Sequence, residues 1–143
     1  MLVEINNQTK KRINLVLVKK IAELFLRSYH LNNQEISLAF VNNQTIKRLN
    51  RIYRGLNKIT DVLAFSDTDK NNFLNEIIIN YEQIKKQAKQ FNHSAQQELI
   101  FILVHGLLHL AGYDDTTDKG AMNMNKLANK FINLNKLTSQ QIN

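Results

Sequence analysis

The stretch that decides the fold spans residues 94–112 and reads SAQQELIFILVHGLLHLAG. Ser94 and Gln97 have the spacing of a helix N-cap and its capping-box partner, and Gly112 supplies a left-handed stop at the other end. The sequence between these ends is almost entirely apolar. A helix that is apolar all round must be buried. We therefore expect a central helix over residues 94–111 that packs against a sheet.

The rest of the chain alternates short strand patterns with helical ones. Strand patterns have period-two alternation or are rich in β-branched residues, and they occur at residues 2–6, 36–41, 60–65 and 76–79. Apolar residues recur at helical spacing over residues 15–29, 43–53, 81–91 and 118–134. A polar loop is expected at residues 66–72 and a frayed tail at residues 135–143. The prediction is an α/β fold with a mixed sheet of about four strands and about five helices.

Length and composition limit the alternatives. A chain of 143 residues fits one domain over residues 1–143. It contains no Cys, so no disulfide partner is expected and any transition metal must be held by His nitrogens or carboxylate oxygens. The first twenty residues lack the order of a signal peptide, and the longest uncharged stretch, residues 99–113, is too short to cross a bilayer. We expect a cytoplasmic protein with no membrane segment.

Positive charge is concentrated in the first part of the chain. The formal charge is +7, and residues 1–60 contain eleven Lys and Arg against three Asp and Glu. Such a surface suits a polyanion such as nucleic acid, although a merely solubilising surface remains an alternative. Several basic residues recur at intervals of three or four, which would make a basic stripe on a helix that extended far enough. The predicted contacts to the RNA backbone are Lys47, Arg48, Arg51, Arg54 and Lys58.

A candidate metal site lies at the end of the central helix. His105 and His109 are four residues apart, so their rings project from one helix face and can bind one ion. Gly112 lets the chain reverse, and either Asp114 or Asp115 can then return a carboxylate as a third ligand. Three ligands leave an open position for a water whose pKa the ion lowers. Two buried imidazoles without a cation would find no hydrogen-bond partners on such an apolar helix.

The spacing of these ligands also overlaps the long zinc-protease pattern. Those proteases place a Glu general base directly after the first His, but this chain has Gly106 there. Glu98 lies two turns upstream and is poorly placed to replace it. Cleavage of an RNA phosphodiester needs less from the protein, because a metal and a cation can stabilise the charge that develops on the phosphate. A peptidase is therefore the weaker alternative.

Three blocks of the sequence resemble the YbeY endoribonucleases, the bacterial rRNA maturation factors. The first block is HGLLHLAGYDD at residues 105–115, similar to the family signature H-G-x-L-H-L-x-G-Y-D-H. The second block, within residues 49–65, resembles L-N-x-x-Y-R-G-x-x-K-P-T-D-V-L-S-F-P. The third, within residues 74–79, resembles L-G-[DE]-I-x-I. The blocks occur in the family's order and cover most of the chain.

This resemblance implies an α/β fold with a mixed sheet and a metal held by the signature His residues. It also implies single-strand-selective RNA cleavage in 16S rRNA 3′-end maturation and ribosome quality control, with the small ribosomal subunit as partner. The family Arg that matches Arg54 lies near the metal and is needed for activity. A guanidinium fork pairs well with phosphate oxygens, so Arg54 is the predicted catalytic residue. An RNA-binding assembly factor without catalysis remains an alternative.

The chain departs from the family pattern at three positions. Ile59 replaces a Pro and Asn75 replaces a Gly, and both changes should affect only local turns. Asp115 replaces the third His, so the predicted metal ligands are His105, His109 and Asp115. We expect one divalent ion, Zn²⁺ first, with Mn²⁺ or Mg²⁺ made more competitive by the oxygen ligand.

Overall fold

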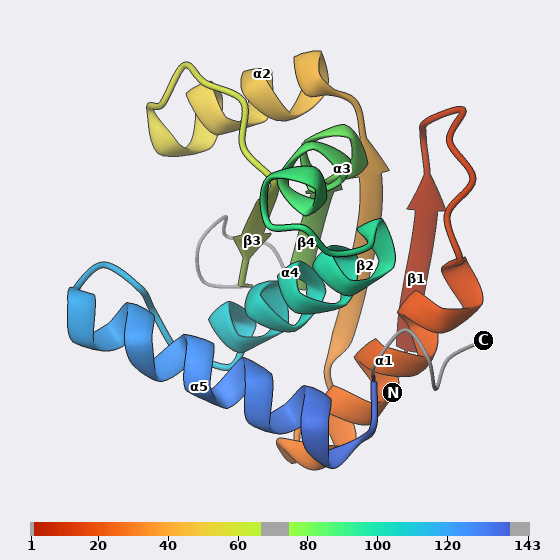
Figure 1. Cartoon of the computed structure of the whole chain (residues 1–143), viewed down its shortest axis with the longest axis vertical. Coiled ribbons are helices and arrows are strands. Elements are labelled where there is room, and N and C mark those ends of the chain that lie inside the picture. The colour runs from red at the N-terminus through yellow and green to blue at the C-terminus, as the bar shows by residue number, and fades with distance from the viewer. Residues whose placement is uncertain (1, 67–74, 138–143) are drawn as a thin grey trace.

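A four-stranded sheet forms the framework of the computed structural model, which describes residues 2–66 and 75–137 (Figure 1). Its strands lie in the order β1-β2-β4-β3. The first three are parallel to one another, and β3 is antiparallel to β4. The predicted mixed sheet of four strands is therefore confirmed. The strand bounds are β1 (Leu2–Asn7), β2 (Glu35–Val41), β3 (Val62–Phe65) and β4 (Asn75–Asn80).

Five helices are present in the described part of the chain, as predicted. Four of them begin at a residue whose side-chain oxygen accepts a backbone N–H of the first turn, which satisfies a donor that the helix itself leaves unpaired. The predicted capping box of Ser94 and Gln97 is one of these. The helix bounds are α1 (Leu15–Ser28), α2 (Asn43–Arg54), α3 (Tyr81–Gln90), α4 (Ala95–Leu110) and α5 (Asp118–Leu134).

Helices cover both faces of the sheet. Successive side chains of a strand point to opposite faces, and β4 shows this clearly. Ile77 and Ile79 join the main hydrophobic core with residues of α1, α4 and α5. Ile78 instead joins a smaller core with Ile46 of α2. This burial on both sides explains why β4 reads as a continuous apolar run rather than an alternating one.

Helix α4 occupies the centre of the main core, as its sequence predicts. It packs against α1, α3, α5, β3 and β4, and Leu103, Leu107 and Leu108 are fully buried. Gly106 faces the sheet, where an added Cβ would lie 3.3 Å from methyl groups of Ile77 and Val62. The missing side chain lets the helix approach the strands closely, and the packing fixes the rotation of α4. The rotation in turn sets the direction of its two histidines.

Two predicted boundaries need correction. Strand β3 begins at Val62 rather than at residue 60. Just before it, the carbonyl of Thr60 accepts from the side chain of Asn80, and the carbonyl of Asp61 accepts from the backbone N–H of Asn80. The prediction of a frayed tail is wrong for residues 135–137, since Leu137 is buried and its N–H donates to the carbonyl of Ile132. Residues 138–143, and residues 67–72 of the predicted loop, lie outside the described part. Within that part, no helix has the length and hydrophobicity needed to cross a membrane.

Candidate metal centre

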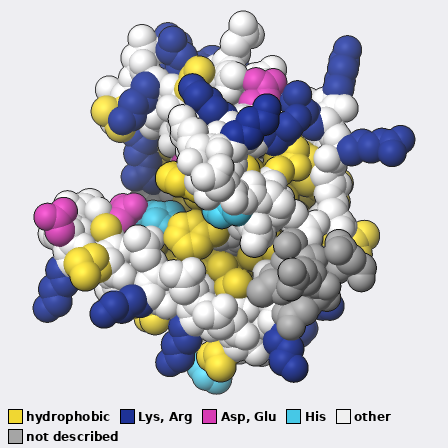
Figure 2. Space-filling view, viewed as in Figure 1, with side chains coloured by type: hydrophobic (Ala, Val, Ile, Leu, Met, Phe, Trp, Pro, Cys, Tyr) yellow, Lys and Arg dark blue, Asp and Glu magenta, His cyan; other side chains and the backbone are white. Residues whose placement is uncertain are grey.

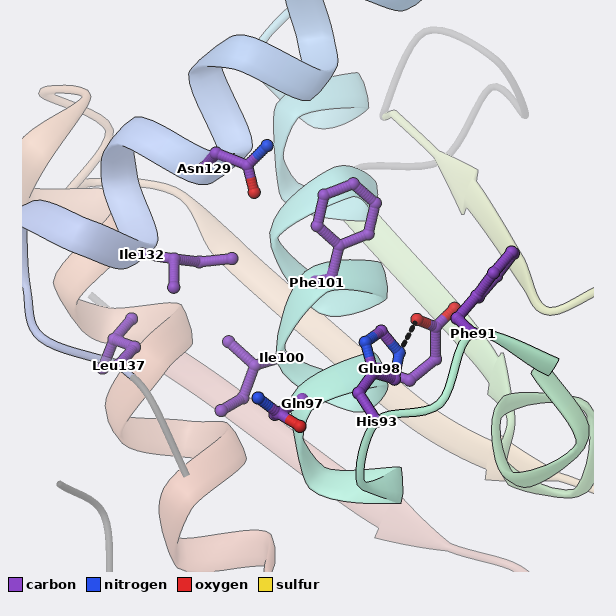
Figure 3. A pocket seen from close by; sticks show the side chains of 9 residues that line it. All are labelled: Phe91, His93, Gln97, Glu98, Ile100, Phe101, Asn129, Ile132 and Leu137. Carbon is purple, nitrogen blue, oxygen red and sulfur yellow. Dashed lines mark hydrogen bonds and ion pairs between the residues drawn. The ribbon is translucent and has the colours of Figure 1, made fainter. Parts of the chain in front are cut away.

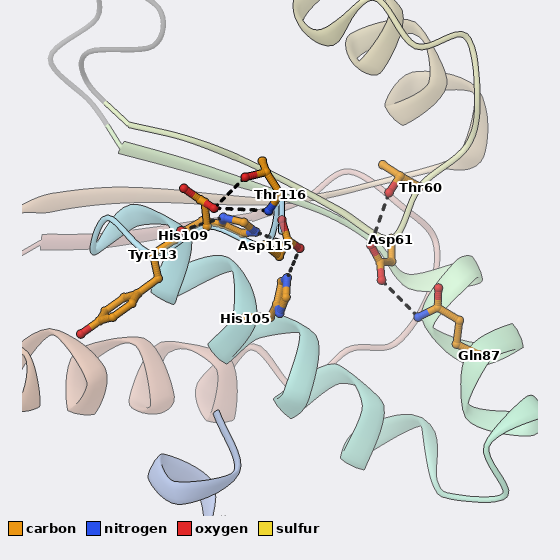
Figure 4. A network of polar contacts seen from close by, with 9 residues as sticks. Thr60, Asp61, Gln87, His105, His109, Tyr113, Asp115 and Thr116 are labelled. Atoms are coloured by element: carbon orange, nitrogen blue, oxygen red, sulfur yellow. Dashed lines mark hydrogen bonds and ion pairs between the residues drawn. The ribbon is translucent and has the colours of Figure 1, made fainter. Parts of the chain in front are cut away.

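Three predicted ligands meet at the C-terminal end of α4 (Figure 4). Nε2 of His105 lies 3.2 Å from Oδ2 of Asp115, and Nε2 of His109 lies 3.7 Å from the same oxygen. One ligand atom from each residue falls within 4.8 Å of the others. Asp114, the alternative ligand, instead accepts hydrogen bonds from the backbone and hydroxyl of Thr116. The geometry therefore favours Asp115 over Asp114.

A tight turn brings Asp115 back to the helix. Gly112 has a φ of 101°, a conformation that residues with a Cβ rarely adopt. The N–H of Gly112 donates to the carbonyl of His109, and the N–H of Tyr113 donates to the carbonyl of Leu108. These bonds cap the last turn of α4 and reverse the chain. The prediction that Gly112 stops the helix is confirmed.

The same turn orients the second histidine. Nδ1 of His109 lies 3.1 Å from the carbonyl oxygen of Tyr113, and only a protonated nitrogen can donate to that oxygen. Nε2 is then the unprotonated nitrogen in the neutral ring, and it faces Asp115. Burial lowers the pKa of His109, and the charge of His105 lowers this pKa further. Both effects favour the neutral imidazole, which is the form that binds a metal.

The arrangement of these ligand atoms fits a divalent cation. The Nε2 lone pair of His109 and the carboxylate oxygen of Asp115 face each other, and neither group can donate a proton to the other in those states. A cation between them would satisfy both acceptors. The side chain of Asp115 is 41% exposed, so one side of the cluster is open to solvent. Two imidazoles, one carboxylate and an open side are the ingredients of a metal site with room for water or substrate.

A cleft of about 640 Å³ connects this cluster with the end of α2. Arg54 is the last residue of α2, and its Nη2 donates to the carbonyl oxygen of Ala64 at 2.7 Å. Its Cζ lies 5.1 Å from the ring centroid of Phe65, a distance typical of a cation–π contact. The guanidinium is thus fixed in position. It lines the same cleft as His105 and His109, although it comes from a different part of the sequence.

The predicted RNA contacts fall into two groups. Lys47, Arg48 and Arg51 are exposed on α2, whereas Arg54 and Lys58 line the cleft. Figure 2 shows many Lys and Arg side chains over the part of the molecule that contains α2. The helix does not continue as far as Lys58, because it ends with a left-handed Gly55. Their contact with RNA stays a prediction.

Sequence reasoning assigned no role to two further residues of the cleft. Asn50 is buried, and its side chain donates to the carbonyl of Lys58 at 3.1 Å, which ties the segment after α2 to that helix. Asp61 accepts from the side-chain amide of Gln87 at 3.2 Å. Both residues belong to the second block that resembles the family, so this resemblance could have indicated that they lie at the site.

The peptidase alternative finds no support at the expected base. Gly106 has no side chain and is buried against the sheet, so the position after His105 supplies no carboxylate. Glu98 is 3% exposed and accepts from Gln87 at 2.8 Å, with His93 at 2.7 Å from its other oxygen. It is not among the residues that line the cleft. Glu98 therefore cannot act as the general base at the histidine pair.

Comparison with known proteins agrees with this geometry. The family model described as endoribonuclease YbeY matches residues 4–136. A Thermodesulfovibrio yellowstonii protein named endoribonuclease YbeY is 47% identical over 102 residues, which cover 68% of this chain and 64% of that protein. A Clostridioides difficile protein of the same name is 31% identical, with 94% and 96% covered. A solution structure of a Thermotoga maritima protein has a TM-score of 0.66 and 28% identity, covering 91% of this chain and 86% of that one. The chain belongs to the endoribonuclease YbeY family.

Proposed function

We propose that residues 1–143 form one domain that is a metal-dependent endoribonuclease, specific for single-stranded RNA. One observation carries the proposal: the two histidines and Asp115 line the same cleft as the fixed guanidinium of Arg54. A group of metal ligands in the same cleft as an oriented guanidinium is suited to phosphodiester chemistry. Membership of the family, whose relatives are named endoribonucleases, supports the same reaction.

The residues of the cleft have separate tasks in this proposal. A divalent ion held by His105, His109 and Asp115 would supply Lewis acidity, lowering the pKa of a coordinated water and offsetting phosphate charge. The carbonyl of Tyr113 keeps the His109 ring in the tautomer that presents Nε2. Arg54 uses Nη2 for the Ala64 carbonyl, and its remaining N–H groups can pair with phosphate oxygens.

The ion that we propose is Zn²⁺, with Mn²⁺ or Mg²⁺ as competitors. Two imidazoles favour Zn²⁺. The carboxylate of Asp115 adds one negative charge and a hard oxygen ligand, which makes the oxygen-preferring ions more competitive than they would be at three imidazoles. Its charge also makes the coordinated water less acidic.

The substrate that we propose is rRNA, at the 3′ end of 16S rRNA and in ribosome quality control, with the small ribosomal subunit as partner in the cytoplasm. Exposed Lys47, Arg48 and Arg51 on α2, together with Lys58 beside the cleft, provide the positive charge for the RNA backbone. Neutralising phosphates with such residues releases counterions, so binding should weaken as salt rises.

A paired measurement tests the proposed function. Metal-free protein is mixed with a single-stranded RNA or with its duplex, and Zn²⁺, Mn²⁺ or Mg²⁺ is added in turn. We expect bound metal and cleavage of the single strand only, and we expect His109→Ala to lose both. Wild-type protein that binds none of these ions would refute the metal site. Protein that binds metal and RNA but does not cut would support the assembly-factor alternative, which the exposed basic residues of α2 favour.

A further inference from the structure

A second cavity, of about 370 Å³, lies between α4, α5 and the segment that follows α3 (Figure 3). The proposed reaction assigns no role to this cavity. Its volume is within the usual range of small-ligand pockets. Its walls are mostly apolar, with a few polar side chains among them. It is lined by Phe91, His93, Gln97, Glu98, Ile100, Phe101, Asn129, Ile132 and Leu137.

Three polar side chains of this cavity, those of His93, Gln97 and Glu98, are held by hydrogen bonds. Glu98 is buried, and one of its carboxylate oxygens lies 2.7 Å from Nε2 of His93, so the carboxylate fixes the imidazole ring. The side-chain oxygen of Gln97 accepts from the N–H of Ser94, which leaves its amide N–H groups for another partner. Asn129 contributes a second amide from α5. The cavity thus offers a small set of oriented hydrogen-bonding groups.

The charge of the lining disfavours a phosphate as occupant. No Lys or Arg is found among the described residues that line the cavity, and it contains the buried carboxylate of Glu98. Phe91, at 64% exposed, has its ring centroid 6.0 Å from that of His93, and Phe101 adds a third aromatic ring to the lining. Aromatic rings with side-chain amides suit a neutral, planar heterocycle that stacks and forms hydrogen bonds at its edge.

The cavity adjoins the cleft of the metal centre. Phe101 lines both, and its ring centroid lies 6.4 Å from that of His105. Figure 2 shows exposed hydrophobic and His side chains together in the hollow between the α2 region and α5. A chain that crosses the cleft with its phosphates near Arg54 can therefore place an adjoining ring in the cavity.

We propose that this cavity, here called the base pocket, receives one unpaired nucleobase of the RNA whose backbone crosses the cleft. The proposal rests on the proposed ribonuclease function. A base that is stacked and paired in a duplex could not enter the base pocket without being flipped out, which costs several kcal/mol in general. The base pocket therefore gives the enzyme a physical means to prefer single strands and to prefer some bases beside the cleavage site.

Abasic substrates test this proposal directly. The Mn²⁺- or Zn²⁺-loaded protein is given a short single-stranded RNA, and a series of copies that each lack one base. The variants are Phe91→Ala and Asn129→Ala, both at exposed positions, with Asn125→Ala on the same helix as the matched control. RNA binding is also measured by fluorescence anisotropy in EDTA, so one readout does not depend on catalysis.

The expected result is position-specific. Removing one base near the cleavage site should lower wild-type kcat/KM and RNA affinity roughly tenfold, the scale of one base–aromatic contact. Phe91→Ala and Asn129→Ala should bind intact RNA more weakly than wild type does. Removing the base should then weaken binding by these variants only slightly further, because the contact with that base is already missing. Asn125→Ala should behave as wild type.

Three results separate the possible failures. Equal losses at every abasic position, or the same abasic penalty in wild type and variants, would overturn the base pocket while leaving the ribonuclease function standing. The base pocket would also be overturned if the protein bound free nucleosides while the loss of affinity and of kcat/KM was the same for every position of the missing base. The cavity would then be a separate small-molecule site. If wild type cuts no RNA with any ion, the proposed function fails. The affinities of the abasic RNAs, measured by anisotropy, then decide by themselves whether a base is bound.

Discussion

Replacing Arg54 with Ala removes a guanidinium that is bonded to the Ala64 carbonyl and lines the same cleft as the histidine pair. Its Nη2 gives up the hydrogen bond to the Ala64 carbonyl, and its contact with the Phe65 ring is lost. The side chain is exposed, so these losses should cost no more than about 1–2 kcal/mol of folding stability. The metal ligands lie on α4 and on the turn after it, and the substitution leaves them intact.

The catalytic cost should be much larger than the structural one. Removing a single preorganised donor from developing charge typically lowers kcat by about 10²–10³. We expect a loss of that size for Arg54→Ala, with unchanged metal content. Arg54→Lys should recover part of it, because Lys keeps the charge but cannot bind the Ala64 carbonyl and a phosphate with one planar fork.

Single-turnover cleavage, metal analysis and thermal unfolding on the same samples check this prediction. Arg51→Ala, on the exposed face of α2, is the comparison. It should weaken RNA binding and lower the slope of log affinity against log salt by about 0.7, as expected for one phosphate contact to a single strand, with little change in kcat. Lys85→Ala on α3 is the control for a basic residue outside the cleft.

Two results would refute the assignment of Arg54. The first is a wild-type kcat in Arg54→Ala with full metal content. The second is a loss of activity that follows the loss of metal or of folded protein rather than the loss of the guanidinium. In either case the cation that faces the phosphate must come from elsewhere, and Lys58, which lines the same cleft, would be the next residue to replace.

Three further predictions concern the metal and the core. Asp115→His should raise Zn²⁺ affinity relative to Mn²⁺ in chelator competition; an unchanged preference would exclude Asp115 as a ligand. Gly106→Leu should destabilise the protein by about 1–3 kcal/mol or more in urea, since even a Cβ would be 3.3 Å from Ile77 and Val62; wild-type stability would show that α4 can shift freely. Leu103→Ala, at a fully buried site, should cost about 2–5 kcal/mol, and a value below 1 kcal/mol would contradict the described packing.

Much of the fold could be read from local patterns. The Ser94–Gln97 capping box and the helical stop at Gly112 are interactions between residues close in sequence, and both are present. The continuous apolar character of α4 predicted its central position, because such a helix has no face to leave in water. Residues 135–137 were less predictable, since Leu137 is buried in the main hydrophobic core by tertiary packing that no local pattern describes.

The sequence by itself determined that His105 and His109 share a helix face, because helical geometry converts a spacing of four into neighbouring rings. It left Asp114 and Asp115 open as the third ligand. Resemblance to the family pattern favoured Asp115, and the tertiary structure agrees with that prediction, because the turn points Asp115 at the rings and leaves Asp114 bonded to Thr116. The tertiary structure also places the end of α2 in the same cleft as the histidines, which helical spacing alone does not predict. Packing on the sheet sets the position of α2, whereas the turn at Gly112 sets the direction of Asp115.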